Sequence, residues 1–234
     1  MKKILLLIGL LLPAFAIANE FEDIVQRAFE SIDKDFDERW AFTETSTRDD
    51  VVRIGRYDPR LPEDGRWTLV SVNGLEPQDD EIEDFLENKE NDRPRRGRDD
   101  KHDGDAEDER EHSEIVNFGS LELIEETGEH WIFDFVPNED DDDEKFMQHV
   151  KGQLKIIKNG HYVASINLRN EKAIRPAVGV KISKFDMAMS FGPAATDGPI
   201  VPIAVDVEVK GRAMLVIRFD EVERTRFSDF EYAP

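Results

Sequence analysis

The chain contains no cysteine. This absence excludes disulfide bonds, thiolate metal sites, a cysteine nucleophile and a lipid attached to an N-terminal cysteine. Because no covalent cross-link is available, the fold must depend on its apolar core. Apolar residues make up 39% of the 234 residues, which is enough for a core of ordinary size.

Positive charge is also scarce. Lysine and arginine number 31 against 53 aspartates and glutamates, and the formal net charge is −22. The field of such a chain repels polyanions, so we expect neither nucleic acid nor anionic lipid headgroups as partners. Acidic charge permits cationic partners, but it also serves solubility alone.

Long hydrophobic runs are limited to one, at the N-terminus. Lys2 and Lys3 precede the uncharged stretch Ile4–Ala18, which closes on the small-x-small pattern Ala16–Ala18. As a helix this stretch spans about 22 Å, which is too short for a hydrocarbon core of about 30 Å. We therefore expect residues 1–18 to be a cleavable signal peptide and 19–234 a single exported domain without a transmembrane segment. Export without disulfides suits the periplasm of a Gram-negative bacterium.

Motifs that name a reaction are missing. The sequence has no G-x-S-x-G, H-E-x-x-H, P-loop or G-x-G-x-x-G pattern, and no two of its five histidines have the spacing of metal ligands. The acidic run Glu139–Glu144 lacks the alternating geometry of a calcium loop and is expected to be a solvated loop. We therefore predict no catalytic residue, no metal site and no cofactor, although a hydrolase with an unrecognised site stays open.

Two amphipathic helices are expected. Residues Glu20–Ile32 place apolar side chains at helical spacing, with acidic residues in the first turn where the helix dipole favours them. Gln78–Asn88 reads as a second, shorter helix. Between and after these helices the apolar pattern has a period of two, which is typical of strands.

About ten strands follow one another through short turns, which predicts an antiparallel sheet. Asn159–Gly160 is a hairpin turn, and a change of parity near Ser183–Lys184 predicts a bulge or bend. Gly211 is expected to separate two strands. The expected strands lie near residues 40–42, 51–54 (after a break at Ser46–Asp50), 66–72, 131–135, 154–157, 162–168, 178–182, 185–191, 201–209, 213–219 and, as a final edge strand, 227–232.

The segment Lys89–His112 has almost no apolar residue. It holds ten acidic and seven basic residues, so it cannot offset its ordering entropy by burial and is expected to be a disordered insertion. Its arginines could bind a phosphate or an acidic partner, or the segment could be a solvated loop that neutralises itself.

One strand carries an unusual alternation of methionine and phenylalanine. Methionine is flexible and polarizable, and surfaces that accept varied hydrophobic groups use it heavily. The same residues would also suit an ordinary core face. The candidate lining of a hydrophobic cavity comprises Phe185, Met187, Met189, Phe191, Trp131, Phe133, Phe135 and Phe29.

The order of these elements resembles a known family. The resemblance rests on Gly152–Ile156 and Tyr162–Ile166 within the long antiparallel run, and on Tyr57–Pro59 with Arg66–Gly74. In these features the chain resembles uncharacterised members of the periplasmic lipoprotein-carrier superfamily, which includes the lipoprotein localisation factors. The resemblance implies an unclosed antiparallel β-barrel with helices in its hollow, where acyl chains or other apolar groups bind. It carries over no functional residue, because no site motif is recognisable.

We therefore expect a mainly β fold, an unclosed antiparallel β-barrel whose N-terminal and inserted helices cover its concave face. The leading functional hypothesis is a soluble periplasmic protein that binds a lipid, acyl chain or lipoprotein and is not an enzyme. An alternative is a non-catalytic scaffold or regulator that binds another envelope protein. An unrecognised hydrolase is the third.

Overall fold

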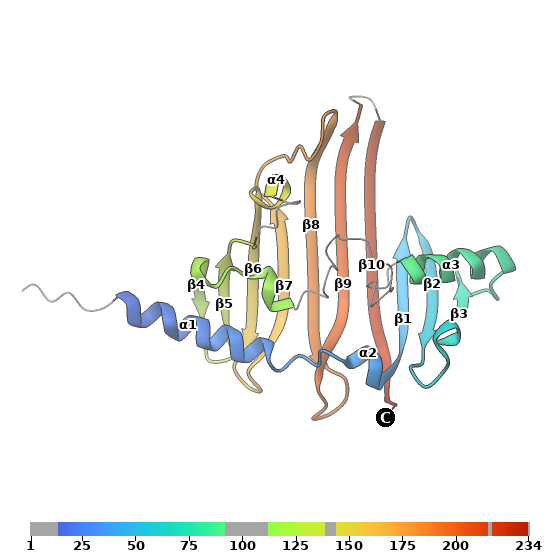
Figure 1. Cartoon of the computed structure of the whole chain (residues 1–234), viewed down its shortest axis with the longest axis horizontal. Coiled ribbons are helices and arrows are strands. Elements are labelled where there is room, and N and C mark those ends of the chain that lie inside the picture. The colour runs from blue at the N-terminus through green and yellow to red at the C-terminus, as the bar shows by residue number, and fades with distance from the viewer. Residues whose placement is uncertain (1–13, 92–111, 139–143, 215–216, 234) are drawn as a thin grey trace, which may run out of the picture.

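The computed structural model describes residues 14–91, 112–138, 144–214 and 217–233. Its body is one ten-stranded antiparallel sheet that does not close into a barrel, so the expected fold class is confirmed (Figure 1). The strands are β1 Trp40–Arg48, β2 Val51–Tyr57, β3 Trp67–Val72, β4 Glu122–Glu126, β5 His130–Phe135, β6 Val150–Ile157, β7 Tyr162–Asn170, β8 Val180–Pro193, β9 Ile200–Ala213 and β10 Ile217–Tyr232.

The strand order places the first strand of the chain, β1, beside the last, β10. It runs β3-β2-β1-β10-β9-β8-β7-β6-β5-β4. The first three strands therefore form one flank, and the chain then crosses to the far edge and returns strand by strand. The prediction that the final strand lies at an edge was wrong. β10 lies between β1 and β9, because its two edges pair with these two strands.

Four α-helices lie in the described ranges: α1 Ala14–Phe29, α2 Phe36–Arg39, α3 Asp79–Asn91 and α4 Glu144–Met147. α1 crosses the sheet over β5 to β7, and α3 packs on β3 (Figure 1). Both long helices differ from their expected bounds. α1 begins at Ala14 and ends before Ile32, which instead forms a bridge with Ile200. α3 continues to Asn91, so the first residues of the expected disordered insertion are helical.

A tight turn explains where β1 ends and β2 begins. Asp49 and Asp50 both have positive φ and make a two-residue turn. β1 therefore runs on to Arg48, beyond the break expected at Ser46. The expected shift near Ser183 is confirmed as a register change between Ile182 and Lys184. Other connections contain short 3-10 helices at Glu63–Gly65, His112–Ile115 and Phe118–Ser120.

Gly211 does not end a strand, contrary to expectation. β9 continues through it to Ala213, and the ring of Phe219 on β10 lies where a Cβ of Gly211 would project, 2.3 Å away at its nearest atom. The glycine thus makes room for an aromatic neighbour inside a long strand. The expected strand at 213–219 is divided, because β9 ends at Ala213 and β10 begins at Ile217.

Several expectations fall on residues outside the described ranges. They include the signal sequence up to residue 13, most of the charged insertion, at 92–111, and the acidic run up to residue 143. Among the described residues, no helix is both long and apolar enough to cross a membrane.

Candidate hydrophobic binding face

The two faces of the sheet differ in character, and the strand register defines them. Paired residues of antiparallel neighbours point to the same side. The inner face is the one that carries α1 and α3, and the outer face is the opposite one. On the inner face Ile166 pairs with Met189, which pairs with Val205, and the ladder continues through Thr225 to Ser46.

The main core forms where α1 covers the inner face. Val25, Ala28 and Phe29 of α1 are buried against the sheet, and the Phe21 ring meets the Phe133 ring edge-on at 5.5 Å. His161, in the β6–β7 turn, donates a hydrogen bond from Nε2 to the Ile24 carbonyl oxygen at 2.9 Å. α1 is therefore held to the sheet by apolar packing and by a polar contact at the turn.

The eight residues predicted from the sequence all join this one cluster, but at different depths. Four phenylalanines are enclosed by other side chains, and Met189 is buried as well. The remaining three are only partly buried. The enclosed set is Phe29, Phe133, Phe135 and Phe191. The partly buried set is Trp131, Phe185 and Met187.

Close packing beneath α1 is visible at one glycine. The Phe135 ring lies over Gly152 of the neighbouring strand, and a Cβ at that position would meet the ring at 2.1 Å. This part of the inner face is therefore filled by the protein's own side chains.

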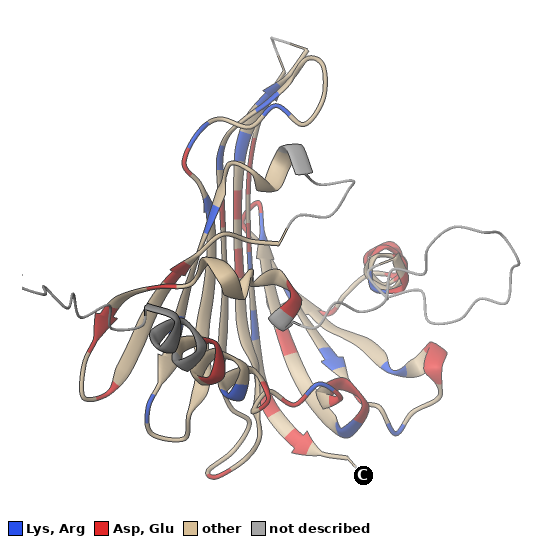
Figure 2. Cartoon of the chain, turned by 60° about the vertical axis from the view of Figure 1, so that its left-hand side comes forward, with Lys and Arg blue, Asp and Glu red and all other residues tan. Residues whose placement is uncertain are grey.

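The apolar face continues from this core onto β8 and β9. We call these inner-facing, partly exposed residues the central strip: Phe185, Met187, Val205, Val207 and Val209. The principal helix contacts with the sheet are those of α1 with β7, α2 with β1, α3 with β3 and α4 with β6. The central strip thus lies between the regions that the two long helices cover (Figures 1 and 2). The alternating valines of β9 were recognised in the sequence as a strand, but periodicity alone did not say which side remains accessible.

Charged residues of β10 and β1 border the central strip on the side away from α1. Val209 pairs with Glu221 and Val207 with Glu223, so both carboxylates point to the inner face. Arg48 of β1 pairs with Glu223 in register and donates to Glu221 Oε2 at 3.1 Å. An apolar surface with a charged border suits an amphiphile, because its chain and its polar end have different surroundings.

A second, smaller core lies under α3. Phe85 packs with Leu69 and Val72, and its ring lies over Gly55, whose Cβ would meet it at 2.7 Å. Sequence reasoning missed the polar contact beside this core, because it placed Lys89 in a disordered segment.

Lys89 Nζ donates to both oxygens of Glu44, at 2.6 and 2.7 Å, and lies 4.4 Å from the centre of the Trp67 ring. The Glu44 side chain is only 8% exposed. Buried carboxylates need a partner, so this contact fixes the last turn of α3 on the sheet.

The outer face is polar, and several of its charges are paired across strands. Lys184 and Lys210 both bind Glu208, at 2.5 and 3.2 Å. The hydrogen bonds from these two lysines, Lys184 first, hold the pKa of Glu208 below its ordinary value. Arg226 binds Asp206 through both Nη atoms, at 2.6 and 2.9 Å.

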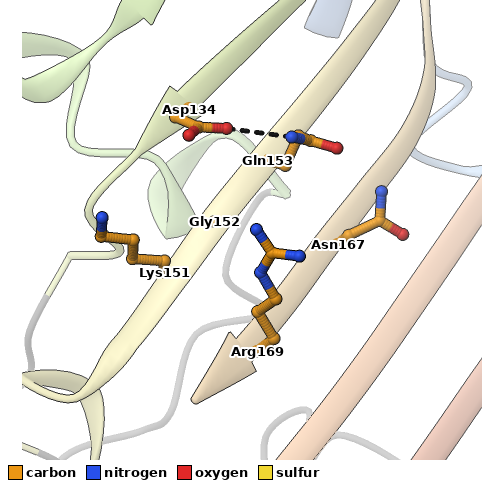
Figure 3. Close-up of a pocket in the computed structure, with 6 residues that line it drawn as sticks. All are labelled: Asp134, Lys151, Gly152, Gln153, Asn167 and Arg169. Atoms are coloured by element: carbon orange, nitrogen blue, oxygen red, sulfur yellow. Dashed lines mark hydrogen bonds between the residues drawn. The ribbon is translucent and has the colours of Figure 1, made fainter. Parts of the chain in front are cut away.

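A small polar hollow of about 30 Å³ opens on β5, β6 and β7 (Figure 3). Gln153 Nε2 donates to Asp134 Oδ1 at 3.0 Å inside it. The volume suits one or two water molecules and is too small for an organic substrate. Its lining is Asp134, Lys151, Gly152, Gln153, Asn167 and Arg169.

A metal site has no candidate ligand cluster among the residues that the structure describes. Within these residues no group of three or more histidine, aspartate or glutamate side chains could hold a metal ion. Comparison with known proteins gives no family model, no curated protein and no solved structure that matches the chain. The geometry of the inner face is therefore the basis for a functional assignment.

Proposed function

We propose that the protein binds a hydrophobic ligand, such as a lipid, acyl chain or lipoprotein, on the central strip, and that it does so in the periplasm without catalysing a reaction. The observation that carries this proposal is the partly exposed apolar surface of β8 and β9 between the regions that α1 and α3 cover. The N-terminal export pattern and the resemblance in element order to lipoprotein carriers support the location and the ligand class.

The energy available from such a surface is adequate. Burial yields about 25 cal/mol per Å², so covering roughly 300 Å² of acyl chain contributes about 7 kcal/mol before ordering costs. Met187 can adapt to chains of different shape, because methionine has three rotatable bonds and no branch. The proposed ligand would lie along the central strip with its polar end toward the row of Arg48, Glu221 and Glu223.

The first measurement is native mass spectrometry of the mature chain from periplasm, followed by denaturing extraction. A co-purified lipid mass would identify the ligand class. A bare polypeptide that also fails to bind phosphatidylethanolamine with a pyrene-labelled acyl chain would refute the proposal. That outcome would favour the alternative of a scaffold that binds another envelope protein.

Two matched variants locate the binding surface. Val207 on β9 points to the inner face, whereas Val222 on β10 pairs with Glu208 and points to the outer face, and both are partly exposed. We expect Val207→Glu to weaken binding of the pyrene-labelled lipid at least about tenfold, because the ligand would bury a charge. Val222→Glu should leave binding unchanged. Equal affinities of the two variants would place the ligand elsewhere.

A further inference from the structure

The three longest strands of the sheet project beyond their neighbours. β7 pairs with β8 only as far as Asp186, and β1 pairs with β10 only as far as Glu223. Beyond these points only β8, β9 and β10 continue as strands, with Ile174 forming a single bridge to Ile182 at the side of β8 (Figures 1 and 2). We call this extension the blade and define it as residues 180–185 of β8, 209–213 of β9 and 217–222 of β10. At about 3.3 Å per residue it rises roughly 15 Å above the body of the sheet.

The free end of the blade exposes large apolar side chains. Val178 is fully exposed, Met214 is 77% exposed and Ile217 is 57% exposed. The Met214 N–H donates to the Gly179 carbonyl oxygen at 2.8 Å, so the chain segments that carry Val178 and Met214 lie side by side. Clustered exposed apolar residues at a projecting end are a feature of contact surfaces.

A row of unneutralised cations lies just behind this apolar end. Lys181 pairs in register with Arg212, and Arg212 pairs with Arg218. Like charges directly opposite one another destabilise a sheet. Among the residues that the structure describes, none of the three cations has an ion pair.

The next rows of the same face behave differently. Lys210 binds Asp220 at 3.1 Å, and Glu208 binds Lys184. Along the blade, ion pairing on the outer face therefore stops before the last row of cations. The sequence has the same asymmetry, since 172–185 and 209–219 contain no acidic residue in a chain that has 53 of them.

We propose that the end of the blade is a contact surface for an anionic phospholipid bilayer. The apolar side chains lie at the extremity and the cations one to three residues behind it, about 3 to 10 Å away. This order matches a bilayer surface, where apolar groups enter the acyl boundary and basic groups stay among the phosphates. The overall charge of −22 leads us to expect repulsion from anionic lipids, but the acidic body and the basic blade together turn the blade toward the membrane.

The charge row is tested with vesicles of phosphatidylethanolamine and phosphatidylglycerol, using flotation of the mature chain. We expect binding that falls with salt and is absent from phosphatidylcholine vesicles. A juxtamembrane cation contributes about a fivefold gain in affinity, so Lys181→Gln, Arg212→Gln and Arg218→Gln together should weaken binding on the order of a hundredfold. The matched control removes three outer-face cations from the body of the sheet: Lys155→Gln, Arg169→Gln and Arg224→Gln.

Insertion of the apolar end is tested with a label. Because the chain has no cysteine, Met214→Cys can be labelled with an environment-sensitive fluorophore at one position. We expect a blue shift on addition of phosphatidylglycerol-containing vesicles, and none for a label at Leu61→Cys in the β2–β3 connection.

Three results would overturn the proposal. The first is an equal loss of vesicle binding in both triple variants, and the second is no spectral shift of the label at position 214. The third is a concentration-dependent dimer that Met214→Asp abolishes. Such a dimer would assign the surface to a second copy of the chain. The Val207→Glu variant should bind vesicles normally, so failure of this proposal is distinguishable from failure of the ligand proposal.

Discussion

Lys89 offers a sharp test of how α3 is held to the sheet. Replacement by methionine keeps most of the stem that packs on Trp67 but removes the only described ion-pair partner of the buried Glu44. Breaking a buried pair from one side costs about 3–5 kcal/mol, because a charge is left without compensation. The Lys89 side chain is 19% exposed, so water can partly replace it, and we expect a loss of about 3 kcal/mol.

The assay is urea unfolding followed by circular dichroism, with hydrogen exchange on the α3 peptide to separate local from global opening. The double variant Glu44→Met with Lys89→Met should recover most of the stability, since it leaves no unpaired buried charge. A single Lys89→Met variant within about 0.5 kcal/mol of the wild type would refute the reasoning, because surface substitutions show changes of that size.

The chain supplies a matched control for this experiment. Lys158 Nζ binds Glu126 at 2.6 Å and lies 4.5 Å from the Trp131 ring centre, so its contacts resemble those of Lys89. Its carboxylate partner, however, is 54% exposed. Lys158→Met should therefore destabilise the protein far less than Lys89→Met, because solvent already screens the Glu126 charge. Equal effects would mean that burial of the carboxylate is not what matters.

Two further predictions concern packing and protonation. Gly152→Ala should cost about 1–3 kcal/mol in urea unfolding, because its methyl group would overlap the Phe135 ring, whereas Gly128→Ala, which meets nothing within 4 Å, should be close to neutral. Lys184→Met should raise the pKa of Glu208 toward its ordinary value, as followed by NMR titration of the carboxyl group. Because the folded-state pKa of Glu208 is depressed, its ion pairs stabilise the wild-type fold at pH values above the unfolded-state pKa. This stabilisation is lost as the pH falls through the folded-state pKa. An unchanged pKa of Glu208 in the variant would contradict the assigned cause.

Local patterns were sufficient to predict an antiparallel, mainly β fold, whereas the unclosed barrel was implied by the family resemblance. Neighbouring residues determine both the Asn159–Gly160 turn and the parity change near Ser183, and both occur as expected. The position of β10 was not predictable in this way. Its place between β1 and β9 depends on pairing between residues such as Arg48 and Glu223, which are far apart in the chain. Alternation specifies that a strand exists but not which strand lies beside it.

The charge composition of the segment around Lys89 did not predict that this residue is ordered. Lys89 belongs to a segment whose composition predicts disorder, yet it is ordered by one buried carboxylate that lies far away in the sequence. For the candidate site, the sequence grouped Phe133 and Phe185 in one candidate lining but could not say that the first is enclosed and the second partly exposed. That difference depends on where α1 lies across the sheet.

The central position of β10 has a consequence for the order of assembly. β10 joins the flank of β1 to β3 to the flank of β4 to β9, yet the ribosome makes it after the other nine strands. Before it emerges, β1 and β9 each lack the neighbour that they have in the finished sheet. Such long-range pairing slows folding and delays completion of the sheet until synthesis has passed residue 232. The two flanks should therefore be expressible apart and joined again by β10 supplied as a separate peptide.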